Sequence, residues 1–391
     1  MRILQVYPYF APAWGFGGVT RVVYEISKGL VRRGHEVTVY ATDALNPRSR
    51  IHVDSNPIWL DGIKVYYFKN ISNCLASKYH VALPLGLFFK SKEIKKFDII
   101  HLHGYRHLLN VVVAHYARKY GMPYLIHTHG SLLRMEEKKR VKRIFDVLCG
   151  YKVLRNAATA IALTETELKQ YKKMGIHENK IVILPNGIDL TQYASLPQKG
   201  SFRKKYGINN EEKIVLYVGR LHESKGIDLL LKTFPRILKE FPNCSLVLVG
   251  PDDGYRNEAE RIAKELKIEN KVVFTGFISQ NEKLAAFVDA NVFVTPRFSG
   301  FPVSFLESCA CGTPIVTTDY GDNLLWLDGN VGFVATCNYE DIAKKIITLL
   351  SDKTVYTKFS ENCKQLVKDK FTWEKIIMAF EKVYTSTAKS I

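Results

Sequence analysis

Short, nearly unbroken apolar runs recur along the whole chain, separated by loops and by segments with helical spacing. A strand that is apolar at nearly every position is covered on both faces, which is typical of a parallel sheet with helices on either side. The runs lie at 3–7, 37–41, 63–68, 98–103, 124–129, 158–163 and 181–184, then at 214–218, 245–249, 272–274, 292–295 and from Ile315 onward. The pattern predicts an α/β fold with parallel sheets.

The chain has 391 residues, more than one hydrophobic core usually supports, so we expect two domains. Each half opens with a strand, a glycine-containing loop and a helix. We place an N-terminal domain at 1–195 and a C-terminal domain at 196–372, with a linker at 194–205. Both should be Rossmann-like, doubly wound sheets that face an interdomain cleft, because such sheets bind ligands at the carboxyl ends of their strands. Segment 373–391 is predicted to form an amphipathic helix that packs back on the N-terminal domain.

Composition limits the class of protein. Apolar residues make up 47% of the chain and charged residues 24%, which excludes long disordered regions. The seven cysteines form no C-x-x-C pair, which argues against a disulfide framework and against a cysteine zinc site. No stretch approaches the ~20 apolar residues of a membrane span, and the first apolar run is too short for a signal peptide. We therefore expect a cytoplasmic protein.

Basic residues are concentrated in the first half of the chain. Residues 1–195 hold 29 Lys and Arg against 14 Asp and Glu, whereas residues 196–391 hold 27 against 24. The excess peaks at 134–155, where basic and apolar residues interleave as in an amphipathic helix on an anionic membrane surface. The apolar segment 81–89 is a second candidate for membrane contact. A solvated helix face is the alternative, and we expect no nucleic-acid partner, because the segment lacks aromatic stacking platforms.

The segment from Val292 to Thr318 predicts a strand, a turn, a helix and a second strand. The turn contains Gly300 and Pro302, and the helix opens near Ser304. Unpaired amides at a helix N-terminus bind anions, so this turn is a candidate anion site. Glu307 lies one turn into the helix, where its carboxylate could hold a sugar diol. A capping box between Ser304 and Glu307 is the structural alternative.

Two further loops suit a bound phosphate. Gly17 and Gly18 follow the first strand of the chain and precede a helix. Arg220 and Lys225 follow the first strand of the second half, where two cations could stabilise two phosphates. A tight turn and a solvated basic loop are the respective alternatives.

Two H-x-H pairs end neighbouring strands, at His101 and His103 and at His127 and His129. We expect His101 and His103 to point to opposite faces of their strand, so that only His103 of the first pair faces a ligand. Four histidines could bind a metal, but no carboxylate or cysteine cluster accompanies them, so we predict a metal-independent protein.

Five motifs together resemble those of the retaining, family-4 glycosyltransferases (glycosyl transferases group 1) of the GT-B fold. They are Gly17-Gly18-Val19, His101-Leu102-His103-Gly104, Leu184-Pro185-Asn186-Gly187-Ile188-Asp189, Gly219-Arg220 with Lys225-Gly226, and Gly300-Phe301-Pro302 through Glu307. The resemblance implies a hexosyltransferase-type enzyme (EC 2.4) that moves a sugar from a UDP- or GDP-sugar. The C-terminal domain would hold the donor and the N-terminal domain the acceptor, as in polysaccharide biosynthesis.

The resemblance also implies roles for single residues. Arg220, Lys225 and His103 would be catalytic, and Tyr9 and His129 would lie on the acceptor side. The donor would be bound by Gly17, Gly18, Gly219, Ser299, Gly300, Phe301, Val303, Ser304 and Glu307. A lipid-linked or cell-surface glycan is the expected acceptor, at the inner face of the cell membrane.

The chain departs from the family pattern at one position. The family has two glutamates eight positions apart, and here Ser299 stands at the first while Glu307 stands at the second. A hydroxyl can hydrogen-bond a sugar but cannot act as a carboxylate nucleophile. A donor-binding subunit without catalytic activity and a nucleotide-sugar epimerase of similar architecture are therefore the alternatives.

Overall fold

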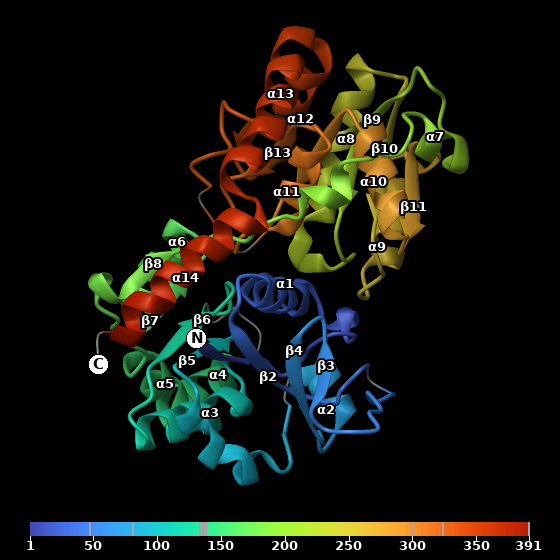
Figure 1. Cartoon of the computed structure of the whole chain (residues 1–391). Coiled ribbons are helices and arrows are strands. Elements are labelled where there is room, and N and C mark those ends of the chain that lie inside the picture. The colour runs from blue at the N-terminus through green and yellow to red at the C-terminus, as the bar shows by residue number, and fades with distance from the viewer. Residues whose placement is uncertain (47, 80–81, 133–138, 299, 323, 390–391) are drawn as a thin grey trace. The chain divides into compact units, whose positions relative to one another are not determined.

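The computed structural model describes residues 1–391 except 47, 80–81, 133–138, 299, 323 and 390–391 (Figure 1). The chain divides into two compact units. The N-terminal unit combines residues 1–187 with 373–391, and the C-terminal unit comprises 188–372. Each unit is an α/β layer structure around a mainly parallel sheet, which confirms the predicted fold class.

The sheet of the N-terminal unit has eight strands in the order β3-β4-β2-β1-β5-β6-β7-β8. All neighbours pair in parallel except β3 with β4, which are antiparallel. The strands are β1 (Arg2–Val6), β2 (Glu36–Thr42), β3 (Ile58–Leu60), β4 (Ile63–Phe68), β5 (Ile99–His103), β6 (Tyr124–His127), β7 (Thr159–Ala162) and β8 (Ile181–Ile183). Strand order reverses between β1 and β5. The edge strand β3 was not predicted, because it has only three residues and these are at least partly exposed.

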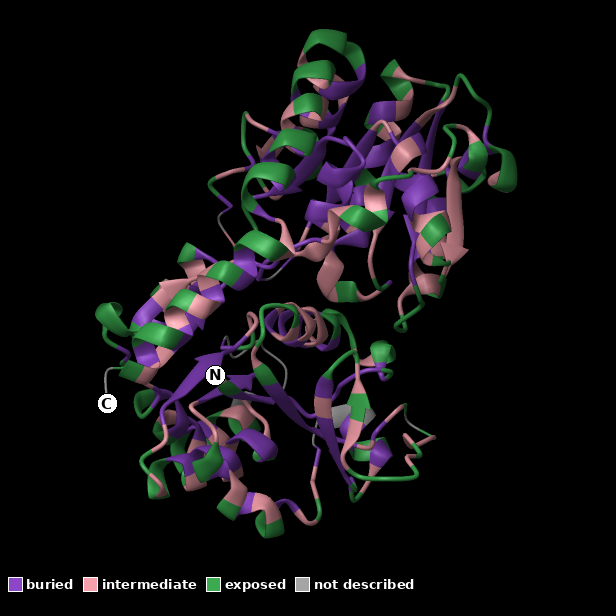
Figure 2. Cartoon of the chain, in the orientation of Figure 1, coloured by how far each residue is buried: buried purple, intermediate pink, exposed green. Residues whose placement is uncertain are grey.

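Helices cover both faces of this sheet, as the buried strands in Figure 2 illustrate. Of these, α1 (Gly18–Arg32) packs on α14 (Trp373–Lys389) so closely that a Cβ on Gly29 would lie 2.6 Å from Ile377 Cγ1. The other helical elements are η1 (Trp14–Phe16), α2 (Asn73–Tyr79), η2 (Leu87–Lys96), α3 (Leu108–Lys119), α4 (Lys139–Phe145), η3 (Asp146–Gly150), α5 (Tyr151–Arg155), α6 (Glu165–Lys173) and η4 (Glu178–Lys180). None of the helices within the described residues is long and apolar enough to cross a membrane.

The sheet of the C-terminal unit has six parallel strands in the order β11-β10-β9-β12-β13-β14. They are β9 (Lys213–Val218), β10 (Cys244–Val249), β11 (Val272–Gly276), β12 (Val292–Thr295), β13 (Ile315–Thr318) and β14 (Gly332–Ala335). The order reverses between β9 and β12. Strand β14 was not predicted from its short sequence, which begins with glycine.

The helical elements of this unit include several whose ends follow from the sequence. Ser279 and Glu282 form the predicted capping box at the start of α10 (Gln280–Asp289). The predicted linker 194–205 instead contains most of α7 (Ser201–Tyr206), because Asp289 accepts hydrogen bonds from the amides of Gly200, Phe202 and Arg203. The others are η5 (Leu190–Tyr193), η6 (Glu223–Lys225), α8 (Ile227–Glu240), α9 (Arg256–Glu265), η7 (Glu269–Lys271), α11 (Val303–Ala310), α12 (Tyr339–Ser351) and α13 (Lys353–Lys370).

Candidate active site

The sites predicted from sequence lie at the two points where strand order reverses. In a doubly wound sheet, the loops after the two strands at such a point diverge and leave room for a ligand. In the C-terminal unit these are the loops after β9 and β12, which carry Arg220 with Lys225 and the start of α11. In the N-terminal unit they follow β1 and β5, near Gly17 and His103.

The loop after β9 is fixed by close backbone contacts with the loop after β10. The Gly219 amide donates to Val249 O at 2.9 Å, and the Leu221 amide donates to Pro251 O at 2.9 Å. A Cβ on Gly250 would lie 1.9 Å from Gly219 O. Gly250 also has a φ of 143°, which favours glycine. The two glycines therefore bring the backbones of the two loops together beneath Arg220.

Lys225 is partly buried at the end of this loop, and Arg220 is exposed. Burial lowers the pKa of Lys225, and the nearby positive charge of Arg220 lowers it further. The positive charges of Lys225 and Arg220 therefore repel each other at one end of the sheet, and a bound anion would remove this repulsion. Asp253 offsets part of that cost, because Arg220 Nη1 donates to its carboxylate at 2.5 Å.

The loop between β12 and α11 lies beside Lys225. A Cβ on Gly226 would come within 3.0 Å of Arg297 Cγ and 3.1 Å of Pro296 Cβ, so the two loops are in contact. Gly300 has a φ of 70°, which turns the chain into the helix. Ser299 lies outside the described residues.

Helix α11 begins at Val303, and its N-cap is Pro302. No side chain of the described residues caps the helix, so the amides of Val303 and Ser304 are left for a ligand. The alternative of a capping box from Ser304 to Glu307 is wrong, because Ser304 lies inside the helix. Phe301 is buried against Trp326 and Phe371, with ring centroids 5.8 and 5.4 Å away, and so supports the turn from below.

The carboxylate of Glu307 is buried and paired with Lys283 of α10. Lys283 Nζ lies 2.7 Å from Glu307 Oε1, and the Glu307 side chain is only 9% exposed. The ion pair holds the carboxylate at the N-terminal turn of α11 while Oε2 is left for a second donor. This pairing was not predicted, because Lys283 reads as an ordinary surface residue of a helix.

In the N-terminal unit, Gly17 has a φ of 107° and forms the N-cap of α1. Gly18 is the first residue of that helix, and a Cβ at either glycine would meet no described atom within 4 Å. The start of α1 is therefore an open helix N-terminus. Tyr9, by contrast, is buried, stacks on Phe16 at 3.9 Å between centroids, and donates from its hydroxyl to Ala76 O at 2.9 Å.

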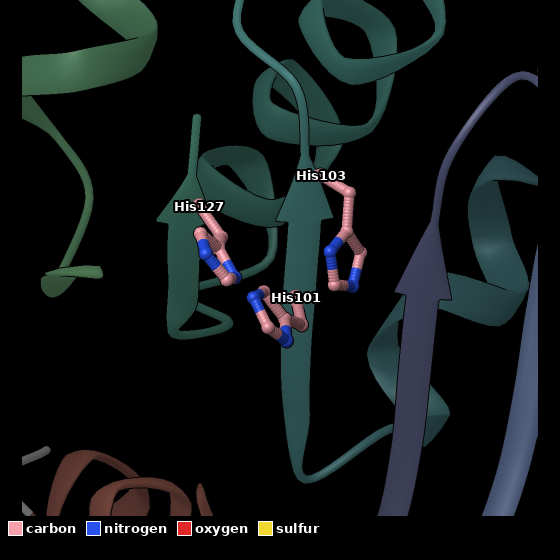
Figure 3. A group of neighbouring side chains, drawn as sticks. All are labelled: His101, His103 and His127. Carbon is pink, nitrogen blue, oxygen red and sulfur yellow. The ribbon is translucent and has the colours of Figure 1, made fainter. Parts of the chain in front are cut away.

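His101, His103 and His127 are buried at the ends of β5 and β6, and the partly buried His129 completes their cluster. The expectation that His101 and His103 point to opposite faces of the strand is wrong, because residues two apart on a strand share a face. His101 and His103 lie on the same face with ring centroids 3.9 Å apart, and His127 lies beside them on β6 (Figure 3). Burial is the largest cause that lowers the pKa of all three, and it lowers the pKa of His129 to about 3. All four imidazoles are neutral at pH 7.

His101, His103 and His127 place ring nitrogens within 4.8 Å of one another, which is a possible metal-ligand arrangement. Both nitrogens of His103 are nevertheless engaged. Its Nδ1 lies 2.9 Å from His129 Nε2, and its Nε2 lies 2.6 Å from Gln5 Oε1. A metal bound by these three residues would have to break one of those hydrogen bonds.

The basic segment predicted at 134–155 is described from 139 onward, so Arg134 and Lys138 lie outside the described residues. It runs through α4, η3 and α5 as one helical stretch anchored at buried Asp146, which accepts 3.0 Å bonds from Arg106. Four apolar side chains on this stretch are exposed, namely Val141, Ile144, Val147 and Leu148. In segment 81–89, Phe88 and Phe89 are also exposed, and α3 contacts both η2 and α5.

Two Rossmann-like units, each with a glycine-containing loop and a helix N-terminus at its switch point, are the architecture of the GT-B class of folds. Family models agree with this class. Residues 16–192 match Glycosyltransferase Family 4, and residues 198–366 match Glycosyl transferases group 1. The chain belongs to this family of GT-B glycosyltransferases.

Three relatives illustrate the likeness. A glycosyltransferase of Methanocaldococcus jannaschii is 27% identical, over 94% of both chains. The UDP-Gal:alpha-D-GlcNAc-diphosphoundecaprenol alpha-1,3-galactosyltransferase of Escherichia coli is 24% identical over 76% of this chain and 77% of its own. The crystal structure of Anabaena HepE in complex with UDP and glucose superposes with a TM-score of 0.76 at 19% identity, over 99% of this chain and all of HepE.

The protein is therefore an enzyme of class EC 2.4 that transfers a sugar from a nucleotide sugar. Sequence reasoning missed Asp253, Lys283 and Gln5. Gln5 left a signal, as the one polar residue within the apolar run 3–7. Asp253 left another, because it follows the strand next to β9 and parallel strands end at one edge.

Proposed function

We propose that this enzyme transfers a sugar, with retention of configuration, from a UDP- or GDP-sugar to a hydroxyl of a lipid-linked or cell-surface glycan. The observation that carries the proposal is the meeting of Lys225, Arg220 and the uncapped start of α11 at the switch point of the C-terminal unit. Cations and unpaired amides are the two elements that bind a diphosphate.

In the proposed donor complex the pyrophosphate lies on the amides of Val303 and Ser304. Lys225 and Arg220 neutralise its charge, and Gly219 lets the backbone approach closely. Glu307 accepts a hydrogen bond from a ribose hydroxyl through the oxygen that Lys283 does not engage. Phe301 fixes the turn, and Gly300 and Ser299 line the sugar end. For the N-terminal unit by itself, we assign donor binding to Gly17 and Gly18 at the open N-terminus of α1.

The proposed reaction proceeds through an oxocarbenium-like state on one face of the sugar. The bond from the anomeric carbon to the phosphate oxygen breaks, and the bond to the acceptor oxygen forms on the same face. The leaving diphosphate oxygen accepts the acceptor proton while Lys225 and Arg220 stabilise its charge. No metal enters this scheme. Ser299, in place of a glutamate, offers no carboxylate nucleophile.

The histidine pair has a defined place in this proposal. Both nitrogens of His103 are engaged, whereas within the described residues His129 uses only Nε2. We therefore assign the direct contact with a substrate hydroxyl to His129 Nδ1 and a supporting place to His103. The buried hydroxyl of Tyr9 is bonded to Ala76 O, so Tyr9 shapes the loop after β1.

Membrane attachment through the segment 139–155 completes the proposal. Val147 and Leu148 are 65% and 71% exposed, and Arg143, Lys152 and Arg155 are exposed on the same stretch. Apolar side chains flanked by cations suit the interface of an anionic bilayer, with Phe88 and Phe89 as a second contact. This surface would bring a cytoplasmic enzyme to a lipid-linked acceptor. The name of the E. coli relative gives a diphosphoundecaprenol-linked sugar as the acceptor of that enzyme.

A donor panel tests the proposal first. UDP-, GDP- and ADP-sugars are added in turn, and the melting temperature is followed, because a ligand that binds only the folded state raises it. The product made with the active donor is then examined by NMR. An inverted anomeric configuration contradicts the mechanism, and donor turnover without acceptor favours the epimerase alternative.

Membrane attachment is tested separately. Vesicles with anionic lipid should co-sediment the protein, and neutral vesicles should not. The double variant Ile144→Ser, Leu148→Ser should lose binding, and Phe277→Ser, which removes an 82% exposed apolar side chain of the C-terminal unit, should retain it. Equal binding by both variants would refute the surface.

A further inference from the structure

A continuous hydrogen-bonded relay links the C-terminal helix to the histidine pair. Tyr384 of α14 is fully buried, and its hydroxyl contacts two side chains of the sheet. It lies 3.2 Å from Gln5 Nε2 on β1 and 2.6 Å from His101 Nδ1 on β5. Gln5 Oε1 continues the relay to His103, whose Nδ1 contacts His129.

With Gln5 Nε2 on Tyr384 and Oε1 on His103, as the structure has them, each link has only one direction that satisfies its atoms. The Gln5 amide nitrogen can only donate, so the Tyr384 oxygen accepts from it. Gln5 Oε1 can only accept, so the proton of neutral His103 is on Nε2. His103 Nδ1 then carries a lone pair, and His129 Nε2 must donate to it. The remaining nitrogen, His129 Nδ1, is thereby left as a hydrogen-bond acceptor.

We propose that Tyr384 and Gln5 are positioning residues that fix the tautomer of His129 and so present Nδ1 of His129 to the substrate as an acceptor. The inference rests on the proposed function, because it assumes the contact between His129 and a substrate hydroxyl that was proposed there. The Gln5 amide sets the direction of every hydrogen bond in the relay, because its nitrogen can only donate and its oxygen can only accept.

Removing the Tyr384 hydroxyl frees the Gln5 amide. In Tyr384→Phe the Nε2 end loses its buried acceptor, and a half turn of the amide would present that end to His103 instead. His103 Nε2 would then accept, Nδ1 would carry the proton, and His129 would accept at Nε2 and carry its proton on Nδ1. The loss of one hydroxyl on α14 would thus change His129 Nδ1 from a hydrogen-bond acceptor into a donor.

The neighbouring histidines fit the same scheme. Since Tyr384 donates to His101 Nδ1, the proton of His101 lies on Nε2, which is buried without a partner among the described residues. Figure 3 shows His101 beside His127, whose two nitrogens are likewise buried without a hydrogen-bond partner in the described part of the chain. Among the described residues, the second branch therefore ends inside the protein, and only the branch through Gln5 reaches His129.

The test reads the tautomers directly. Nitrogen-15 NMR of histidine-labelled, full-length protein at pH 7 should show His103 and His129 protonated on Nε2. In Tyr384→Phe, His129 should shift toward the form protonated on Nδ1, and kcat with the donor sugar should fall about tenfold. Tyr40→Phe is the matched control, because Tyr40 is also a fully buried tyrosine of this sheet and contacts none of these side chains.

A second variant, Gln5→Met, keeps the volume and removes both ends of the amide, so the tautomer of His129 should become mixed. A wild-type His129 protonated on Nδ1 would overturn the proposal. So would a Tyr384→Phe variant with wild-type tautomers and turnover. If wild type transfers no sugar from any donor, the proposed function fails, while the NMR result still decides the relay.

Discussion

Replacing Lys225 with methionine separates the effect of this lysine on the stability of the fold from its effect on donor binding. The side chain is partly buried beside Arg220, and both effects lower the pKa of its amine. A lowered amine pKa means that the charged form is penalised in the folded state, so the penalty is present below the folded pKa and is relieved as pH rises through it. Methionine keeps the aliphatic length without the charge. We expect Lys225→Met to melt at a higher temperature than wild type at pH 7 in the absence of donor.

Donor affinity should move in the opposite direction. A hydrogen bond from a charged group contributes about 1.5–3 kcal/mol, which corresponds to a loss of about 10- to 150-fold in affinity. Arg220 should contribute less, because its side chain is 62% exposed and already bonded to Asp253. Raised stability together with weakened binding is the signature of a residue placed for its ligand rather than for the fold.

The measurement combines thermal melting without ligand and calorimetric titration with UDP or GDP. Lys239→Met removes an exposed lysine from α8 and is the control for charge alone. The reasoning would be refuted if Lys225→Met lowered the melting temperature and bound nucleotide as wild type does. In that case the cation would serve the fold, and the diphosphate would have to lie elsewhere.

Three further outcomes are expected. Asp253→Asn leaves Arg220 without its carboxylate partner and should tighten nucleotide binding by a few-fold at most, as a titration at low salt would show. Lys283→Met leaves the buried Glu307 carboxylate without its cation, so urea unfolding should show a loss of about 1–3 kcal/mol, and an unchanged midpoint would contradict the pairing. The buried histidines, all with lowered pKa values, bind protons more readily when unfolded, so stability should fall as pH drops below about 6.5. Melting curves between pH 7 and 4 test this, and a flat profile would contradict it.

The sequence predicted the sheets well, because buried parallel strands are apolar at nearly every position. Arg220, Lys225 and Glu307 were placed from motif and charge, and the structure puts their loops at the switch point of one sheet. Partners far along the chain could not be predicted. Glu307 meets Lys283 across two helices, and His103 meets Gln5 across two strands. Such pairs depend on packing, which local spacing does not encode.

Two errors have simple physical causes. The faces of His101 and His103 were assigned against the two-residue period of a strand, although both rings lie together. The linker at 194–205 was inferred from Pro197 and Gly200, but Asp289 recruits that stretch into the C-terminal unit by accepting from three of its amides. A turn-forming residue marks a change of direction and does not by itself mark a domain boundary.

The N-terminal unit is completed by the last helix of the chain, which is made only after the whole C-terminal unit. During synthesis, domains generally fold in order as they leave the ribosome. Here the N-terminal unit cannot complete its folding first, because Ile377 of α14 packs beside Gly29 only after α14 has been synthesised. Tyr384 arrives with that helix. A nascent chain could therefore fold its C-terminal unit before the histidines of the N-terminal unit have acquired their final protonation.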